Sequence, residues 1–457
     1  MKNYVLMLNH PLKGDNGQMI NSKEFAKRRR QLLRMMGRDS IAILPTSPVR
    51  MRNRDVEYRY RPDSDFYYLT GFPEPGAVAV LLPRRCHGEF ILFCRQRDPH
   101  MESWHGRRAG QAGAIRDYGA DDSFPIDDID DILPGLLENK ERVFYTMGRH
   151  PGYDQRVMAW VNRLRDKSRA GVHTPGEFVS LDHFLHDMRL YKSASEIKVM
   201  KEAAKISAEA HSRAMSVCRP GMMEYEIEAE LIRTYHQNGS QAPAYTPIVG
   251  SGANSCILHY NENNRLMESG DVLLIDAAAE VDYYASDITR TFPVNGKFSK
   301  AQRSIYELVL EAQLAAIEEV KPGNHWNDPH KAAVKVVTSG LVKLGLLSGR
   351  LSTLIKNEAH TQFYMHRTGH WLGMDVHDVG DYKVGDEWRL LEPGMVMTVE
   401  PGIYIAAGSK GVSRKWRNIG IRIEDDVVVT RSGNQVISKA APRQIQDIEA
   451  IVGSADI

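Results

Sequence analysis

Apolar and polar residues follow two different periods in the first part of the chain. A helical spacing places apolar side chains on one face of residues 25–36. Short apolar runs, rich in β-branched and aromatic residues, follow this helix. They predict strands at residues 41–44, 66–69, 77–82 and 90–94. The pattern therefore predicts a mixed α/β domain at the N-terminal end.

Polar sequence without a clear period follows at residues 166–177 and is a candidate linker. We place the domain boundary near residue 185, so that residues 1–185 form a smaller N-terminal domain and residues 186–457 form a larger one. With 457 residues the chain exceeds what one hydrophobic core usually serves, which agrees with two domains.

The second domain opens with a strong helix signal. Ser193 and Glu196 have the S-x-x-E spacing of a capping box ahead of an apolar face, and the sequence CRPG at 218–221 ends this helix. A second amphipathic helix, with its apolar face from Ile305 onward, ends in the similar sequence VKPG at 320–323.

Two strand patterns repeat in the same order as these helices. The sequence GDVLLID at 270–276 and the sequence GMVMTVE at 394–400 both begin with glycine and end in a carboxylate. We interpret the repeated elements as a degenerate internal duplication. The expected fold class is therefore α/β (α+β), with equivalent carboxylates on either side of a pseudo-symmetry axis in the second domain.

Composition narrows the class of protein. Hydrophobic residues make up 42% and charged residues 26% of the chain, as in ordinary globular proteins. The net charge of +1 gives no reason to expect nucleic acid or an anionic membrane as a partner. No apolar stretch is long enough to predict a membrane span or a signal peptide. The 4 cysteines lack CxxC spacing, which predicts reduced thiols in a cytoplasmic protein.

Two aspartates are the first candidate metal-binding residues. Asp276 ends an apolar strand, and Asp287 lies in a second β-like run at residues 284–292. A tight turn at 281–282 would pair the two aspartates in a hairpin, with Cβ atoms about 5 Å apart. Two carboxylates at that distance are costly unless a cation lies between them. Taken alone, such a pair can also be a solvated hairpin end.

The second half of the domain repeats this arrangement. Glu400 follows an apolar strand, and Glu424 ends a later run that starts at Ile419. Four carboxylates would thus converge in two equivalent pairs. By contrast, we expect the carboxylates that flank turns or strand ends to face solvent, namely Glu392, Asp425 and Asp426.

Histidines supply a nitrogen ligand. His366, His370 and His377 lie close together in sequence and are separated by glycines, a pattern that core packing does not explain. His259, just before the first predicted hairpin, is weaker evidence. Four carboxylates and an imidazole suit divalent ions such as Mn2+, with Zn2+ or Co2+ as alternatives. Two ions roughly 3.5 to 4 Å apart can activate water, so the residues indicate metal-assisted hydrolysis.

Longer motifs span nearly the whole chain. They are YRYRPDSDFYYLTGFPEPGAV at 58–78, WHGRRAGQ at 104–111, ILHYNENN at 257–264, GDVLLIDAAAEVDYYASDITRTFPVNGKF at 270–298, HRTGHWLGMDVHDVG at 366–380, LEPGMVMTVEPGIYI at 391–405 and IGIRIEDD at 419–426. In this order they closely resemble the pita-bread metallopeptidases, in particular the aminopeptidase P family of bacterial type.

This resemblance implies a pita-bread catalytic domain that holds two divalent metal ions, most simply Mn2+. The ligands would be Asp276, Asp287, His370, Glu400 and Glu424. Among them, Asp287 and Glu424 would bridge the ions. The chain departs from the family's pattern at Ala278 and Ser286, which affects local packing more than metal binding.

The resemblance also implies an activity, the removal of the N-terminal residue from peptides with proline in the second position. Glu400 would transfer the proton, and His377 would donate a hydrogen bond to the developing oxyanion. The residues expected to bind substrate are His259, His366, His377, Tyr404 and Arg422. The first three of these are also candidate catalytic residues.

The N-terminal domain would serve oligomerisation, as a dimer or tetramer, and the selection of substrate length. Trp104 of a neighbouring subunit would close the proline pocket, or would otherwise be an ordinary core or surface residue. A prolidase, which cleaves only Xaa-Pro dipeptides, would have the same ligands, and a two-metal site is also suited to organophosphate esters. A methionine aminopeptidase would not need the large first domain. A non-catalytic peptide-binding scaffold of this fold would be expected to lack ligands, whereas all the ligand positions are intact.

Overall fold

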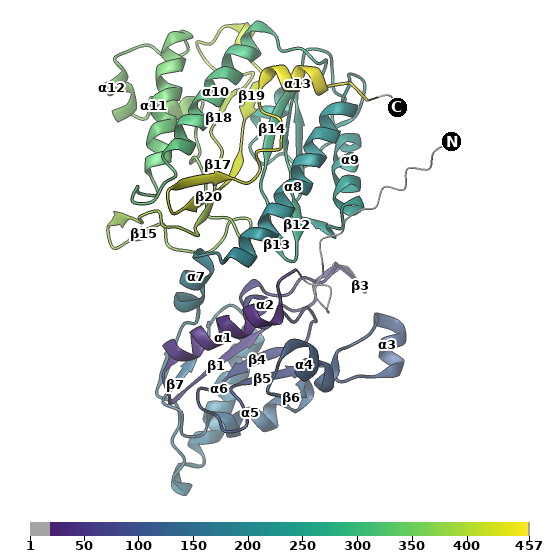
Figure 1. Ribbon diagram of the computed structural model, residues 1–457, viewed down its shortest axis with the longest axis vertical. Helices are drawn as coiled ribbons and strands as arrows, with labels where there is room; N and C mark the ends of the chain where they lie inside the picture. Colours follow the sequence, from purple (N-terminus) through teal and green to yellow (C-terminus); the bar gives the residue numbers. More distant parts are fainter. Residues whose placement is uncertain (1–18, 456–457) are drawn as a thin grey trace. The chain divides into compact units, whose positions relative to one another are not determined.

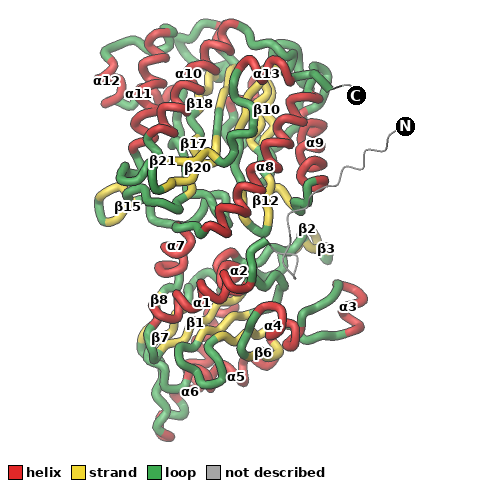
Figure 2. The backbone as a smooth tube through the Cα atoms, in the orientation of Figure 1, coloured by secondary structure: helices red, strands yellow, loops and turns green. Residues whose placement is uncertain are grey.

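The computed structural model of the protein describes residues 19–455, which divide into two compact units after His186 (Figure 1). Each unit has a hydrophobic core of its own. Helices and strands both occur in each unit (Figure 2), so the mixed α/β class predicted from the sequence is confirmed.

The first unit is built on one mixed sheet. Within residues 19–186, six strands pair in the order β6-β5-β4-β1-β7-β8, with β1 antiparallel to β4 and parallel to β7. The strands are β1 (Ser40–Pro45), β4 (Val78–Leu81), β5 (Phe90–Cys94), β6 (Asp122–Pro125), β7 (Arg142–Phe144) and β8 (Glu177–Val179). A separate exposed pair consists of β2 (Met51–Asn53) and β3 (Val56–Glu57).

Helices cover this sheet. On one face, Leu133 of α5 (Ile129–Leu137) and Trp160 of α6 (Pro151–Arg165) join the strands in a buried apolar cluster. The helix predicted at residues 25–36 is confirmed as α1 (Ser22–Met36). The remaining helices are α2 (Ser64–Thr70), α3 (Pro99–His105) and α4 (Gly110–Tyr118), while α7 (Asp182–Leu190) contains the division between the units.

The strand predicted at residues 66–69 was wrong, because this segment is the helix α2. The Asp63 carboxylate accepts hydrogen bonds from the first backbone N–H groups of the helix, and Gly71 ends it with φ of 65°. Every residue of α2 is buried. A short apolar run that is buried on all sides has no polar face, so its periodicity does not separate helix from strand.

In the second unit, a pair of helices followed along the chain by a sheet occurs twice. α8 (Ala194–Val217) packs against α9 (Glu224–Gln237) ahead of the sheet β10-β11-β14, and α10 (Lys300–Glu318) packs against α11 (Asp328–Lys343) ahead of the sheet β17-β20-β21 (Figure 1). Capping boxes start both α8 and α10. This repetition is the internal duplication that the sequence predicted.

The smaller elements complete this unit. The strands of the two sheets are β10 (Ile248–Ser251), β11 (Val272–Asp276), β14 (Thr289–Pro293), β17 (Val396–Val399), β20 (Asp425–Thr430) and β21 (Gly433–Val436). The others are β9 (Ala242–Pro243), β12 (Ala279–Val281), β13 (Tyr284–Ala285), β15 (Lys383–Val384), β16 (Glu387–Trp388), β18 (Gly402–Ile405) and β19 (Ile419–Arg422), with α12 (Leu351–Lys356) and α13 (Ile445–Ile451).

The first hairpin has a different register from the one predicted. Asp276 pairs with Thr289 across β11 and β14, and not with Asp287. The turn lies at residues 282–283, whose φ angles of 46° and 65° are those of a two-residue hairpin turn. It is therefore centred later in the chain than the turn predicted at 281–282. The two aspartates instead meet at the hydroxyl of Tyr245.

Two further expectations concern the chain as a whole. No helix within residues 19–455 is long and apolar enough to cross a membrane. All the cysteines are free thiols, as predicted, and they are Cys86, Cys94, Cys218 and Cys256.

Candidate active site

Two carboxylates and an imidazole meet where the repeated sheets of the second unit end. The ligand atoms of Asp287, His370 and Glu424 all lie within 4.8 Å of one another. Glu424 immediately precedes β20, and Asp287 lies shortly before β14, so equivalent strands of the two sheets carry them. Trp371, which follows His370, forms a bridge to β17. The internal duplication therefore positions the centre of this cluster.

Glu400 and Asp276 complete the cluster. Glu400 follows β17, and its Oε1 lies 3.8 Å from Nε2 of His370. Asp276 ends β11 and shares a hydrogen-bonding partner, Tyr245, with Asp287. The structure thus brings together all the residues that the sequence identified as candidate ligands. Their role as ligands stays a prediction.

His370 directs one ring nitrogen at the carboxylates. Its Nδ1 lies 2.9 Å from the backbone oxygen of Trp371, and a carbonyl only accepts, so Nδ1 carries a hydrogen and donates it. Nε2 lies 3.3 Å from Oδ2 of Asp287. Burial lowers the pKa of His370, but the hydrogen bond and charge of Asp287 outweigh burial and raise this pKa to about 9. Because Nδ1 donates to this carbonyl, Nε2 is the nitrogen that would give up its proton to become a metal ligand.

Tyr245 is a site residue that the sequence analysis missed. Its hydroxyl oxygen lies 2.5 Å from Oδ1 of Asp276 and 2.5 Å from Oδ1 of Asp287. Burial, together with the charges of both aspartates, raises the pKa of Tyr245 well above its usual value, so the hydroxyl keeps its proton. No local pattern in the sequence marked Tyr245, because its place beside Asp276 depends on the pairing of Ile248 with Asp276 across β10 and β11.

Arg422 is the cation that connects several parts of the site. Its Nη2 donates to Oδ2 of Asp276 at 2.6 Å, and its Nε donates to Oγ1 of Thr289 at 3.0 Å. Thr289 in turn donates to Oε2 of Glu424 at 2.7 Å. Arg422 therefore holds Asp276 directly and orients Glu424 through Thr289, another residue that the sequence analysis missed.

His366 is held in one tautomer by its neighbours. Its Nδ1 lies 2.7 Å from the backbone oxygen of Arg367 and donates to it, which leaves Nε2 as an acceptor for the Tyr404 hydroxyl at 2.9 Å. Arg422 donates to the same hydroxyl at 3.0 Å. Burial and the charge of Arg422 lower the pKa of His366 to about 4, so this imidazole is neutral near pH 7.

His377 and His259 lie on the exposed side of the cluster. The His377 ring meets the His370 ring edge to face, with centroids 4.3 Å apart. Burial and the charge of His370 lower the pKa of His377, which keeps its imidazole neutral near pH 7. His259 is exposed, and its charge contributes to lowering the pKa of both His366 and His377. The predicted histidines therefore gather around the candidate ligands.

Trp104 belongs to the first unit, where it lies on α3. Its side chain is 74% exposed. A core position is therefore excluded for this tryptophan, and a surface position or a contact with another subunit is left.

The burial of the site carboxylates and their mutual repulsion outweigh the stabilisation that the neighbouring cations provide. Burial, with the charges of Asp287 and Asp276 added, raises the pKa of Glu400 to about 7 despite His370. Burial and the neighbouring carboxylates likewise raise the pKa of Glu424 well above its usual value. Tyr245 has one proton for two carboxylate oxygens. Such a set of oxygen donors with one imidazole nitrogen fits divalent cations.

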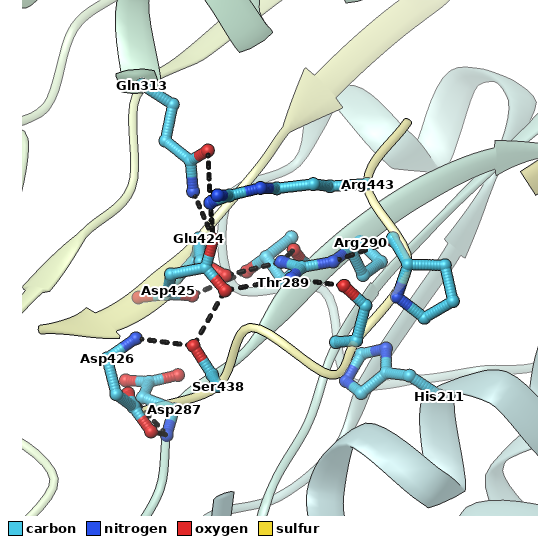
Figure 3. Close-up of polar contacts among 12 residues, drawn as sticks. His211, Asp287, Thr289, Arg290, Gln313, Glu424, Asp425, Asp426, Ser438 and Arg443 are labelled. Carbon is cyan, nitrogen blue, oxygen red and sulfur yellow. Dashed lines mark hydrogen bonds and ion pairs between the residues drawn. The ribbon is translucent and has the colours of Figure 1, made fainter. Parts of the chain in front are cut away.

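A buried polar network lies behind Glu424 (Figure 3). Arg290 is fully buried, donates to the backbone oxygen of Glu424, and donates to Oδ1 of Asp425 at 2.8 Å. Asp425 accepts further hydrogen bonds from Arg443 at 2.6 Å, Gln313 at 2.8 Å and Ser438 at 2.6 Å. These hydrogen bonds thus fix the position of the backbone at Glu424.

The prediction that Asp425 and Asp426 face solvent was wrong, because both are 0% exposed. Asp426 accepts hydrogen bonds from the Ser286 hydroxyl at 2.7 Å and from the backbone N–H of Asp287 at 3.1 Å. Glu392 is exposed, as predicted. The buried pair therefore supports the segments that carry Glu424 and Asp287.

An oxygen-rich cluster with one imidazole, built by two repeated α/β halves, defines the class of metal-dependent hydrolases. Residues 198–431 match the metallopeptidase family M24, and residues 25–145 match the N-terminal domain of aminopeptidase P. The chain belongs to metallopeptidase family M24, in the branch that carries this N-terminal domain.

Similar proteins match over almost their whole length. Xaa-Pro aminopeptidase of Escherichia coli is 44% identical over 95% of this chain and 99% of its own. The structure of Pseudomonas aeruginosa aminopeptidase PepP has 60% identity and a TM-score of 0.94, covering 94% of this chain and 98% of that one. Zinc-substituted E. coli aminopeptidase P in complex with product has 44% identity and a TM-score of 0.93, covering 96% and 100%.

Proposed function

We propose that this chain is an Xaa-Pro aminopeptidase, which releases the N-terminal residue from peptides that have proline in the second position. The observation that carries this conclusion is the convergence of the five candidate ligands in a chain 44% identical to Xaa-Pro aminopeptidase of E. coli. A non-catalytic scaffold is not supported, because every candidate ligand is in place. Prolidase is the less favoured alternative, since the relatives that match over nearly all of their length are aminopeptidases.

Two divalent ions would be held by the candidate ligands. Asp287 and Glu424, which the family resemblance assigns to both ions, lie with His370 in one group whose ligand atoms are all within 4.8 Å of one another. When bound, the ions would polarise the scissile carbonyl and generate a nucleophile from water at neutral pH. The predominance of oxygen donors favours Mn2+. A zinc-substituted relative indicates that the site is not restricted to one metal.

Side chains of this protein would then move protons and orient the substrate. Glu400 lies 3.8 Å from a ring nitrogen of both His366 and His370, a position from which it can pass a proton to the leaving proline nitrogen. That nitrogen needs a proton, because it leaves as a secondary amine. His377, exposed and neutral, would donate a hydrogen bond to the oxyanion. The proline ring would contact His259, His366 and Tyr404, with Arg422 holding Tyr404 in place.

The first unit would contribute to assembly. The exposed Trp104 would contact the active site of a neighbouring subunit in a dimer or tetramer, and the domain formed by residues 1–185 would thereby restrict substrate length. A cytoplasmic location is supported by the free thiols.

The test is a kinetic panel of Xaa-Pro dipeptides and matched Xaa-Pro-Yaa tripeptides with added Mn2+. Faster cleavage of the tripeptides, with release of Xaa, is the expected result. Matched peptides with alanine in place of proline are the control and should be poor substrates. Cleavage confined to dipeptides would identify a prolidase instead, and no cleavage of any Xaa-Pro peptide by the metal-loaded protein would overturn the proposal.

A further inference from the structure

The second unit has a recess beside the segment that carries His366 and His370. Its volume is about 590 Å3. Three aromatic side chains and three charged side chains form most of its wall, namely Trp326, Tyr382, Trp388, Arg367, Asp381 and Lys383. The recess lies wholly within one unit and uses no candidate metal ligand.

Aromatic packing joins this recess to the active-site segment. The Trp326 ring lies 4.2 Å from the Trp371 ring, centroid to centroid, and Tyr382 stacks on Trp371 with an angle of 2° between the ring planes. Trp371 is fully buried and directly follows His370. At the other end of the segment, Arg367 directly follows His366 and lines the recess. The recess is therefore built on the segment that carries two of the site histidines.

The charges in the recess are unbalanced. Arg367 and Lys383 both lie over the ring of Trp388, with their charged groups 5.4 Å and 4.9 Å from its centroid. Among residues 19–455 neither cation forms an ion pair, and Arg367 donates to the amide oxygen of Asn327 instead. Two cations thus face one carboxylate, that of Asp381. An added carboxylate would reduce the repulsion between two cations that share one aromatic ring.

We propose that this recess binds the C-terminal part of the peptide substrate, beyond proline. The free carboxylate of the peptide lies between Arg367 and Lys383, and an apolar side chain of the peptide packs on Trp326, Tyr382 and Trp388. This inference rests on the proposed function and names a substrate class within it, namely short peptides with a free C-terminus. Amphipathic peptides with an aromatic residue after proline fit both the charge and the walls.

Matched peptides that differ only at the C-terminus test this proposal. Xaa-Pro peptides about three to six residues long, each as a free acid and as an amide, present the carboxylate at increasing reach. At low salt we expect kcat/KM of the parent enzyme to favour the acid over the amide by about threefold to fivefold at one or more lengths, as for an exposed ion pair. High salt should reduce this ratio.

The variants Arg367→Gln and Lys383→Gln, alone and combined, should bring the ratio of acid to amide towards one. Lys335→Gln removes a cation from the groove between α10 and α11, away from the recess, and is the matched control that should keep the parent's ratio. Trp388→Leu should reduce kcat/KM more for peptides with an aromatic residue after proline than for those with alanine. Metal content and melting temperature, measured for every variant, check that the fold is intact.

Two results would overturn the recess as a carboxylate site. One is a ratio near one in the parent at every peptide length. The other is a parent ratio that the double variant Arg367→Gln, Lys383→Gln leaves unchanged. Both results keep the cleavage of Xaa-Pro amides, so they are distinct from failure of the proposed function, in which neither acids nor amides are cleaved.

Discussion

The hydroxyl of Tyr245 joins two aspartates that do not face each other in the sheet. Its oxygen lies 2.5 Å from Oδ1 of Asp276 and 2.5 Å from Oδ1 of Asp287, whereas Asp276 pairs with Thr289 across the strands. A phenol has one proton to donate, so only one of these contacts can be an ordinary hydrogen bond. The arrangement is satisfied when a cation lies at the carboxylates, which links Tyr245 to metal binding.

Tyr245→Phe is therefore expected to weaken Mn2+ binding by about tenfold to a hundredfold, the usual cost of removing a group that orients a ligand. Calorimetric titration of the metal-free protein with Mn2+ measures this change. Tyr235→Phe is a matched control, because Tyr235 is a fully buried tyrosine of the same unit and its hydroxyl has no hydrogen-bonding partner within the described residues. Equal Mn2+ affinities for the two variants would contradict the role assigned to Tyr245.

Glu424→Ala should lower kcat/KM by more than about a hundredfold and reduce the metal content, because a shared carboxylate belongs to both ions.

In the metal-free protein, removing the carboxylate of Glu424 should instead raise the stability. Glu424 adds a buried carboxylate beside Asp287 and Glu400, whose charges help to raise its pKa. Glu424→Gln keeps an oxygen that accepts from Thr289 and needs no added proton to be neutral in the folded state, so the melting temperature of the metal-free protein near pH 7 should rise. Retention of two ions and full activity in Glu424→Ala would refute the assignment.

The histidines should divide by role. His370 directs Nε2 at Asp287 and Glu400, so His370→Ala should reduce metal content. His377 is exposed and contacts the His370 ring, so His377→Ala should keep the ions and lower kcat, as expected for a group that acts on the transition state. Elemental analysis beside steady-state kinetics separates these effects. Loss of metal from His377→Ala but not from His370→Ala would reverse the two roles.

The sequence predicted the parts of this site that depend on local pattern. Asp276 and Glu400 were found because the first ends an apolar strand and the second follows one, and the two helix pairs were found from their caps and matching ends. It did not predict features that depend on partners distant in sequence. Asp425 is buried by Arg290 and Gln313, which lie 135 and 112 residues away, and acidic residues after a strand otherwise resemble a turn. Tyr245 was missed for the same reason, because the pairing of β10 with β11 has no local signal.

Trp104→Ala should impair the cleavage of longer Xaa-Pro peptides if this residue contacts a neighbouring active site. The loss of apolar contact is worth roughly 1 to 3 kcal/mol, and metal content should not change. Because the side chain is 74% exposed, removing it should cost little stability in the isolated subunit. Kinetics over a series of peptide lengths, repeated at protein concentrations at which sedimentation shows the monomer, test this point. Equal kinetics for mutant and parent at every length would leave Trp104 as a surface residue.

The buried network behind Glu424 should contribute both to stability and to metal binding, because it joins Asp425 to the backbone of Glu424 through Arg290. Asp425 is the carboxylate partner of two arginines, Arg290 and Arg443, and Arg290 also holds the backbone oxygen of Glu424. Asp425→Asn leaves these cations without their counterion, which should cost about 3 to 5 kcal/mol of the free energy of unfolding, measured by denaturant titration. Because Arg290 then loses its anchor, the affinity for Mn2+ should also fall, although Asp425 is not among the candidate ligands.

A substitution of Gln313, the partner of Asp425 on α10, separates the effect on stability from the effect on metal binding. Gln313→Leu removes one donor to Asp425 and leaves Arg290 paired, so it should reduce stability while Mn2+ affinity stays close to that of the parent. A general loss of folding would lower the metal affinity of both variants in proportion to their stability. If Asp425→Asn bound Mn2+ as tightly as the parent did, the network would stabilise the fold without positioning Glu424.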